Sequence, residues 1–136
     1  MHLLGMQTKM IRTTDISVYT SGDTIAAIKA SDLKERVRIV NSTENGVLIS
    51  IHQNYYSNGR YDGAQVFYAD TPGSKDFAKL MQTALREGLD PGNNRVSKPS
   101  EGIYLMKHIQ KTGILVECGF LSNHSEEAKL RDNEYQ

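Results

Sequence analysis

The chain has 136 residues, of which 38% are hydrophobic and 24% charged, and this size and composition fit one globular domain. Sixteen basic and sixteen acidic residues give a formal net charge of zero. This balance argues against a nucleic-acid partner, because phosphate neutralisation needs a basic excess. No run approaches the roughly 18 apolar residues of a membrane span, and one cysteine excludes an internal disulfide.

The first half of the chain predicts a strand, a long helix and a second strand. Residues 8–13 alternate weakly between polar and apolar types and predict a short strand. A stripe of apolar residues at helical spacing predicts a helix over about 24–43. Asn45-Gly46 predicts a turn, and the apolar run 47–51 predicts a strand that ends at His52. A polar loop follows over 54–63.

The second half alternates strands and helices. We expect strands over 64–69, 103–106 and 114–118, the last one ended by Gly119. We expect helices over about 75–87, with Ser74 as its cap, and over 126–132. Such alternation predicts an α/β fold with a mostly parallel sheet flanked by helices, built as one domain over residues 1–136.

Glu117 is the most informative residue, because it interrupts an otherwise apolar strand. A carboxylate is seldom buried without a partner or a task, and open α/β sheets place their sites at the carboxyl ends of strands. The alternative is a strand-end acid that points to solvent. Cys118 follows it on the opposite face, where it reads as a small buried apolar residue rather than a nucleophile.

His52 stands at the end of another apolar strand. Histidine is a frequent metal ligand and titrates near neutral pH, although a lone strand-end His is often only a hydrogen-bonded core residue. Two strands that each deliver one such group suggest a metal-assisted or acid/base site at one edge of the sheet.

Three ordered motifs resemble one family. They are Ser50-Ile-His-Gln-Asn54, Gly63-Ala-Gln-Val-Phe-Tyr68 and Leu115-Val-Glu-Cys-Gly-Phe-Leu-Ser-Asn123. Together they resemble the zinc-dependent N-acetylmuramoyl-L-alanine amidases, with an amidase-like fold of the phosphorylase/hydrolase type. His52-Gln-Asn-Tyr-Tyr56, Leu89-Asp-Pro91 and Val116-Glu-Cys118 are most similar to the spore-cortex, germination-related subgroup.

The resemblance implies a function and a site. The family cleaves the amide between N-acetylmuramic acid and L-alanine in peptidoglycan. By resemblance, His52 would be a Zn²⁺ ligand, Glu117 the catalytic carboxylate, and Asn54 and Arg95 substrate-binding residues. The implied partner is peptidoglycan or a muropeptide and the implied location is the cell wall or spore cortex, although the N-terminus does not read as a signal peptide.

The chain also departs from the family pattern. The family's first strand, its Gly-His-Gly-Gly-like metal-binding turn and its zinc-binding Glu have no match, so we expect an N-terminally truncated domain with two zinc ligands missing and impaired hydrolysis. As replacement ligands His2, Glu101, His108 and His124 have little in their favour. One imidazole cannot hold zinc as three protein ligands do.

Two alternative functions stay open. The chain could be a catalytically inactive module that still binds peptidoglycan near Asn54 and Arg95. It could also be a metal-independent protein in which Glu117 closes a hydrogen-bond network.

The roles of several other side chains are also predicted only in outline. The loop tyrosines could stack on sugar or pack the loop onto the domain; they are Tyr55, Tyr56 and Tyr61. Arg36 and Asn41 are expected to tie the long helix to the sheet.

Overall fold

The computed structural model describes residues 5–136. Its elements in chain order are α1 (Ile25–Ser42), β1 (Val47–Asn54), β2 (Gln65–Tyr68), α2 (Ser74–Leu89), β3 (Lys98–Pro99), α3 (Tyr104–His108), β4 (Thr112–Phe120) and α4 (His124–Leu130). The expected helix over 24–43 is confirmed, and the Thr24 hydroxyl caps it by accepting from the Ala27 amide at 3.2 Å.

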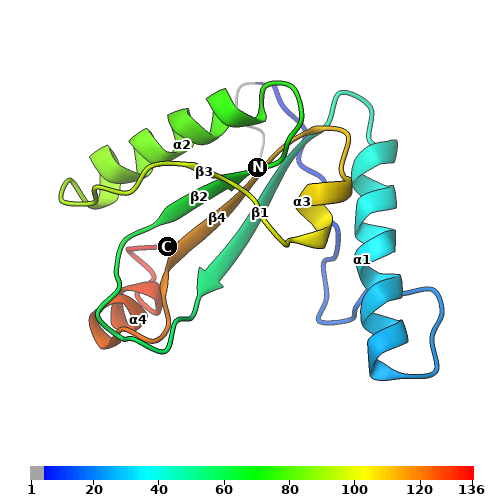
Figure 1. Ribbon diagram of the computed structural model, residues 1–136, viewed down its shortest axis with the longest axis horizontal. Coiled ribbons are helices and arrows are strands. Elements are labelled where there is room, and N and C mark those ends of the chain that lie inside the picture. The colour runs from blue at the N-terminus through cyan, green and yellow to red at the C-terminus, as the bar shows by residue number, and fades with distance from the viewer. Residues whose placement is uncertain (1–4) are drawn as a thin grey trace.

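The strands form one sheet in the order β1-β4-β2-β3, with helices on both faces (Figure 1). β1 runs parallel to β4, and β2 runs parallel to β3. The β2–β4 pair is antiparallel, so the expected α/β fold with a mostly parallel sheet is confirmed and contains one reversed pairing. The central strand β4 joins the two parallel pairs.

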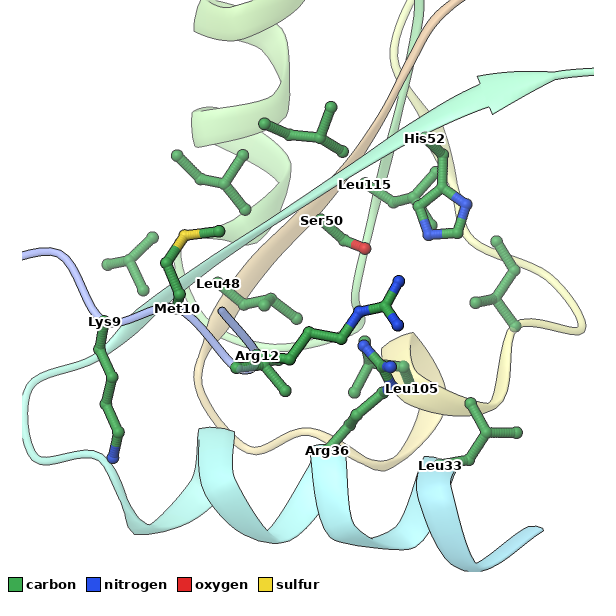
Figure 2. A pocket seen from close by; sticks show the side chains of 15 residues that line it. Lys9, Met10, Arg12, Leu33, Arg36, Leu48, Ser50, His52, Leu105 and Leu115 are labelled. Atoms are coloured by element: carbon green, nitrogen blue, oxygen red, sulfur yellow. The ribbon is translucent and has the colours of Figure 1, made fainter. Parts of the chain in front are cut away.

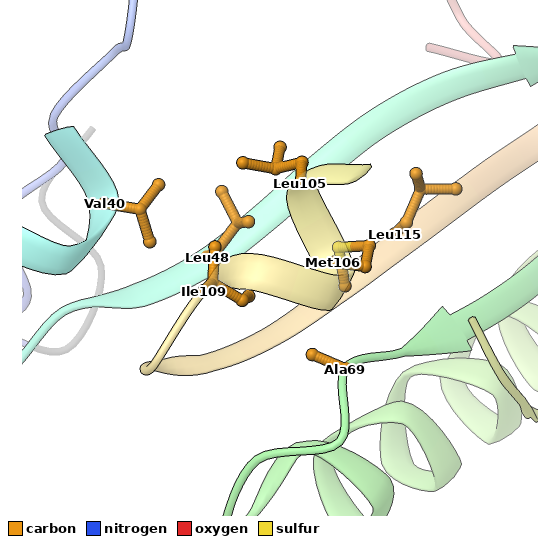
Figure 3. Packing of buried hydrophobic residues seen from close by; sticks show 7 residues of the cluster. All are labelled: Val40, Leu48, Ala69, Leu105, Met106, Ile109 and Leu115. Carbon is orange, nitrogen blue, oxygen red and sulfur yellow. The ribbon is translucent and has the colours of Figure 1, made fainter. Parts of the chain in front are cut away.

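Two apolar clusters lie on opposite faces of β4. Leu115 packs with α1 and α3 on one face, in the cluster of Figure 3, which contains Val40, Leu48, Ala69, Leu105, Met106, Ile109 and Leu115. Ile114 and Val116 pack with Val66 and with Ala78 of α2 on the other face. Because β4 is covered on both sides, it reads as a continuous apolar run rather than as an alternating one.

Two expected strands are wrong. Residues 8–13 form no strand; Ile11 packs against the cluster of Figure 3, and the Lys9 ammonium donates to the Thr43 hydroxyl at the end of α1 at 3.5 Å. Residues 103–106 were expected as a strand, but α3 begins at Tyr104. A run of four apolar residues does not distinguish a strand from a buried helix, and the contacts of Leu105 and Met106 with α1 and β4 favour the helix here.

The ends of two other elements also differ from expectation. Gly119 does not end β4, which continues to Phe120. Ser74 is the first residue of α2 and not its cap; its hydroxyl accepts instead from the Gly113 amide at 2.9 Å.

Within the described residues, β1 is an edge strand with an apolar exposed stripe. Val47, Ile49 and Ile51 are 54%, 47% and 74% exposed. They pair in register with residues on the α2 face of β4, but α2 itself packs over β2 and β4. No helix in residues 5–136 combines the length and apolar character needed to cross a bilayer.

Candidate active site

The sheet brings His52 and Glu117 side by side. β1 and β4 pair in parallel, and His52 is the register partner of Glu117. Partners in a parallel ladder point to the same face, so both side chains lie on the face that α1 and α3 cover further back along the strands. The expectation that two strand ends would deliver one group each to a common place is therefore met by the geometry.

The environment of Glu117 suits a proton carrier. Burial raises the pKa of its carboxyl, and the nearby charge of His52 opposes that rise only in part. Its Oε2 atom is buried and has no hydrogen-bond partner among the described residues. Glu117 therefore does not close a hydrogen-bond network through this oxygen, and the alternative that gave it such a role lacks support.

Cys118 faces away from this pair. It packs against the α2-side cluster of Val66, Ile114 and Val116. Burial, with a smaller contribution from the charge of Glu117, raises the pKa of the thiol. A protonated thiol is a poor nucleophile, which agrees with the interpretation of Cys118 as an apolar side chain.

Beyond the His52–Glu117 pair, β4 makes a bulge. The register shifts between His52 and Asn54, so that Asn54 pairs with Phe120. The Asn54 carbonyl then accepts from the Leu121 amide at 2.8 Å. Asn54, two residues past His52, and Phe120, three residues past Glu117, thus lie at the same end of the sheet as the pair.

An aromatic cluster covers this end of the sheet. The Tyr56 and Tyr61 rings meet edge to face with centroids 5.0 Å apart, and Tyr61 lies 6.1 Å from the Phe120 ring. The Tyr56 amide also donates to the Ser122 hydroxyl at 3.2 Å. Tyr56 and Tyr61 therefore contact the domain although they are 53% and 45% exposed, whereas Tyr55 is 72% exposed.

Arg95 joins the cluster from a different segment. Its guanidinium carbon lies 5.0 Å from the centre of the Phe120 ring, and its Nε donates to the Asp62 carbonyl at 2.8 Å. The residues expected to form the site are therefore gathered at one end of the sheet. His52, Asn54 and Glu117 come through the β1–β4 register, and Arg95 through Phe120.

Glu126 is a buried acid that the sequence did not single out. It is 5% exposed, and its Oε2 accepts from the Gly63 amide at 2.9 Å. A β-carbon at Gly119 would lie 2.8 Å from the same oxygen, which explains why a glycine stands there. Gly119, two residues after Glu117, gives no hint in the sequence of the carboxylate for which it makes room.

A second buried polar group fixes the start of β2. The side-chain oxygen of Gln82 accepts from the Val66 amide at 2.8 Å, and its nitrogen donates to the Ala64 carbonyl at 3.0 Å. Asn93 also donates to the Ala64 carbonyl, at 2.9 Å. Together with Glu126, these side chains hold the loop between β1 and β2 in place.

A cavity of about 620 Å³ lies along β1 on the α1 side and ends at His52 (Figure 2). The Ser50 hydroxyl and the Arg12 and Arg36 guanidinium groups are directed toward the same space. Arg36 is held there by Asp32 of its own helix at 2.5 Å. Glu117 does not line this cavity, so the cavity lies beside the candidate site and does not form its centre.

Asn41 connects α1 to the segment before β4, as expected. Its Nδ2 donates to the His108 carbonyl at 3.3 Å, and its Oδ1 accepts from the Gln110 amide at 2.8 Å.

The described residues do not fit a zinc ion by themselves. Within residues 5–136, no three His, Cys, Asp or Glu side chains come together as a metal site, whereas catalytic zinc needs three protein ligands. His108 instead stacks on Tyr104, and its Nδ1 lies 2.8 Å from the Tyr104 carbonyl. His2 lies outside the described residues. His52 and the free oxygen of Glu117 thus provide two neighbouring donors at most.

Comparison with known proteins decides the family. The model of the family described as N-acetylmuramoyl-L-alanine amidase matches residues 1–136. The chain belongs to this family. The germination-specific N-acetylmuramoyl-L-alanine amidase of Bacillus subtilis (strain 168) is 41% identical over 109 residues, which are 79% of this chain and 46% of that protein.

Solved structures of the amidase family agree with the fold. The CwlD amidase from Clostridioides difficile, in complex with the GerS lipoprotein, superposes with a TM-score of 0.85 at 37% identity, over 92% of this chain and 65% of that one. An N-acetylmuramoyl-L-alanine amidase from Clostridium difficile 630 gives a TM-score of 0.69 at 30% identity, over 76% of this chain and 56% of that one. The chain spans about half the length of the Bacillus subtilis germination amidase it matches.

Proposed function

We propose that this chain is part of an N-acetylmuramoyl-L-alanine amidase that cleaves the amide between N-acetylmuramic acid and L-alanine in peptidoglycan. The observation that carries the proposal is the pairing of His52 with Glu117, whose buried Oε2 lacks a partner. Family membership and the similarity to a germination-specific amidase support the same substrate class. We propose the cell wall or spore cortex as the place of action.

Glu117 is the residue to which we assign proton transfer. A carboxylate with a raised pKa accepts a proton from the attacking water more readily than an ordinary one. It can then protonate the nitrogen of L-alanine as the amide bond breaks. This assignment uses only the position and the environment of Glu117.

For His52 we propose the role of a zinc ligand, with Zn²⁺ as the cofactor. Because the described residues offer no complete donor set, we assign no step of the reaction to the metal. The 136-residue chain should accordingly retain little zinc and should hydrolyse muropeptides slowly.

Two measurements test this function. Release of the L-alanine amino group from a muramoyl peptide, with zinc added, should be detectable for the wild-type chain and abolished in Glu117→Gln. Metal analysis of the purified chain should give much less than one zinc per molecule. A Glu117→Gln variant as active as wild type would refute the catalytic role. One full equivalent of zinc, lost together with hydrolysis in His52→Ala, would refute the incomplete site.

A second candidate function is a peptidoglycan-binding module without catalysis. The incomplete donor set favours it, as does the intact cluster of Tyr56, Tyr61, Phe120 and Arg95 beside Glu117. Co-sedimentation with insoluble peptidoglycan at neutral pH tests it directly. Retention without hydrolysis would favour the module, and a chain that stays in the supernatant would rule it out.

A further inference from the structure

Arg95 presents a fixed guanidinium group at the edge of the proposed site. Its Nε donates to the Asp62 carbonyl at 2.8 Å, and its guanidinium carbon lies over the Phe120 ring, 5.0 Å from the ring centre. Its backbone amide donates to Asn93 Oδ1 at 2.9 Å, and Asn93 itself is buried. These contacts fix both ends of the residue, so little side-chain entropy remains to be lost when a ligand binds.

The two terminal nitrogens of Arg95 form no hydrogen bond or ion pair with the rest of the described chain. They are the paired donors that bind a carboxylate in bidentate fashion. Arg95 lines a surface hollow of about 530 Å³ together with Asp62, Asp90 and Asn94. Neither acid forms an ion pair with Arg95 among the described residues.

The charges of this hollow select the kind of ligand. One guanidinium and two carboxylates do not favour a simple anion such as phosphate, because the acids would repel it. They fit a group in which a carboxylate and an amino group lie close together. Arg95 would bind the carboxylate, and Asp62 or Asp90 would face the amino group.

The distance from Glu117 indicates where on the substrate such a group would lie. Because of the bulge, the three residues from Glu117 to Phe120 span the two steps from His52 to Asn54, which corresponds to roughly 7 Å along the strand. Arg95 lies just beyond, over the Phe120 ring. An extended peptide covers that distance with about three residues, counted from the amide at Glu117.

We infer that Arg95 is a specificity-determining residue that binds the carboxylate of a zwitterionic amino acid about three residues along the stem peptide from the cleaved amide. A diamino acid at that position carries both groups. The inference rests on the proposed function and adds the part of the substrate that the chain distinguishes. It does not depend on bound metal.

Calorimetric titration of the 136-residue chain tests this inference without requiring turnover. The probes are a muramoyl tripeptide that ends in diaminopimelic acid and the same tripeptide with its side-chain carboxylate converted to the carboxamide. Wild type should bind the acid about tenfold more tightly than the amide, as the loss of a charge-assisted hydrogen bond predicts. In Arg95→Gln this preference should disappear, with the affinity for the amide nearly unchanged.

The matched control is Lys75→Gln. Lys75 is an exposed cation beside Ser74, whose hydroxyl contacts Gly113 at the opposite end of β4 from Glu117. The Lys75→Gln substitution removes one positive charge and should keep the tenfold preference for the acid over the amide.

Four results would overturn the inference. If Arg95→Gln weakens both ligands equally, Arg95 only supports the loop. If the preference survives in Arg95→Gln, another group reads the carboxylate. If wild type binds neither tripeptide, the proposed function fails, and the inference fails with it; binding of both without discrimination overturns the inference alone.

Discussion

Replacement of Glu126 by alanine should detach the loop that borders the candidate site. Glu126 is 5% exposed and accepts from the Gly63 amide at 2.9 Å. A hydrogen bond to a charged group contributes about 1.5–3 kcal/mol, and its loss leaves a buried N–H without a partner. The ion pair with Lys129, at 3.8 Å and half exposed, adds little. We therefore expect a loss of about 2 kcal/mol in the free energy of unfolding.

Urea denaturation measures this loss, and amide exchange locates it. A change of about 2 kcal/mol should lower the melting temperature of a domain of this size by roughly 6–10 °C. In native-state hydrogen exchange, the Gly63 amide should lose most of its protection. Glu126→Gln keeps an oxygen for the Gly63 amide and should cost only about half as much.

The neighbouring residue provides the control. Glu127 lies on the same turn of α4, where it pairs with Arg131 at the surface. Glu127→Ala should therefore change the free energy of unfolding by less than about 0.5 kcal/mol. If both alanine variants lose the same stability, or if the Gly63 amide keeps its protection in Glu126→Ala, the loop is not held by this carboxylate.

Three further predictions concern the sheet. Because burial raises the pKa of the Glu117 carboxyl, the contribution of this carboxyl to stability is present at low pH and is lost as the pH rises through the folded-state pKa. Glu117→Gln should thus be more stable than wild type at about pH 8 but not at about pH 4. Equal stability differences between the two proteins at both pH values in urea melts would contradict this. Gln82→Leu leaves the Val66 amide without its acceptor and should lower the free energy of unfolding by about 1–3 kcal/mol in the same assay. An unchanged urea midpoint would show that the amide finds another partner. Ile51→Lys on the exposed stripe of β1 should reduce aggregation, measured by light scattering, with a change in stability within about 0.5 kcal/mol; undiminished scattering would exclude this edge as the cause.

The sequence alone determined the features that depend on neighbouring residues. Apolar runs located β1 and β4, and the apolar stripe of α1 predicted that helix almost to its ends. The motifs around His52 and Glu117 also identified the family, because each motif is a short, continuous segment.

The tertiary structure decided what depends on segments far apart in the chain. The β1–β4 register placed His52 beside Glu117, and no local pattern encodes which residues of two strands face each other. The reversed direction of β2 and the helix at Tyr104 likewise follow from packing against β4 and α1. Glu126 shows the reason most clearly, because its buried carboxylate accepts from the Gly63 amide, in a loop that only the folded sheet brings within 2.9 Å.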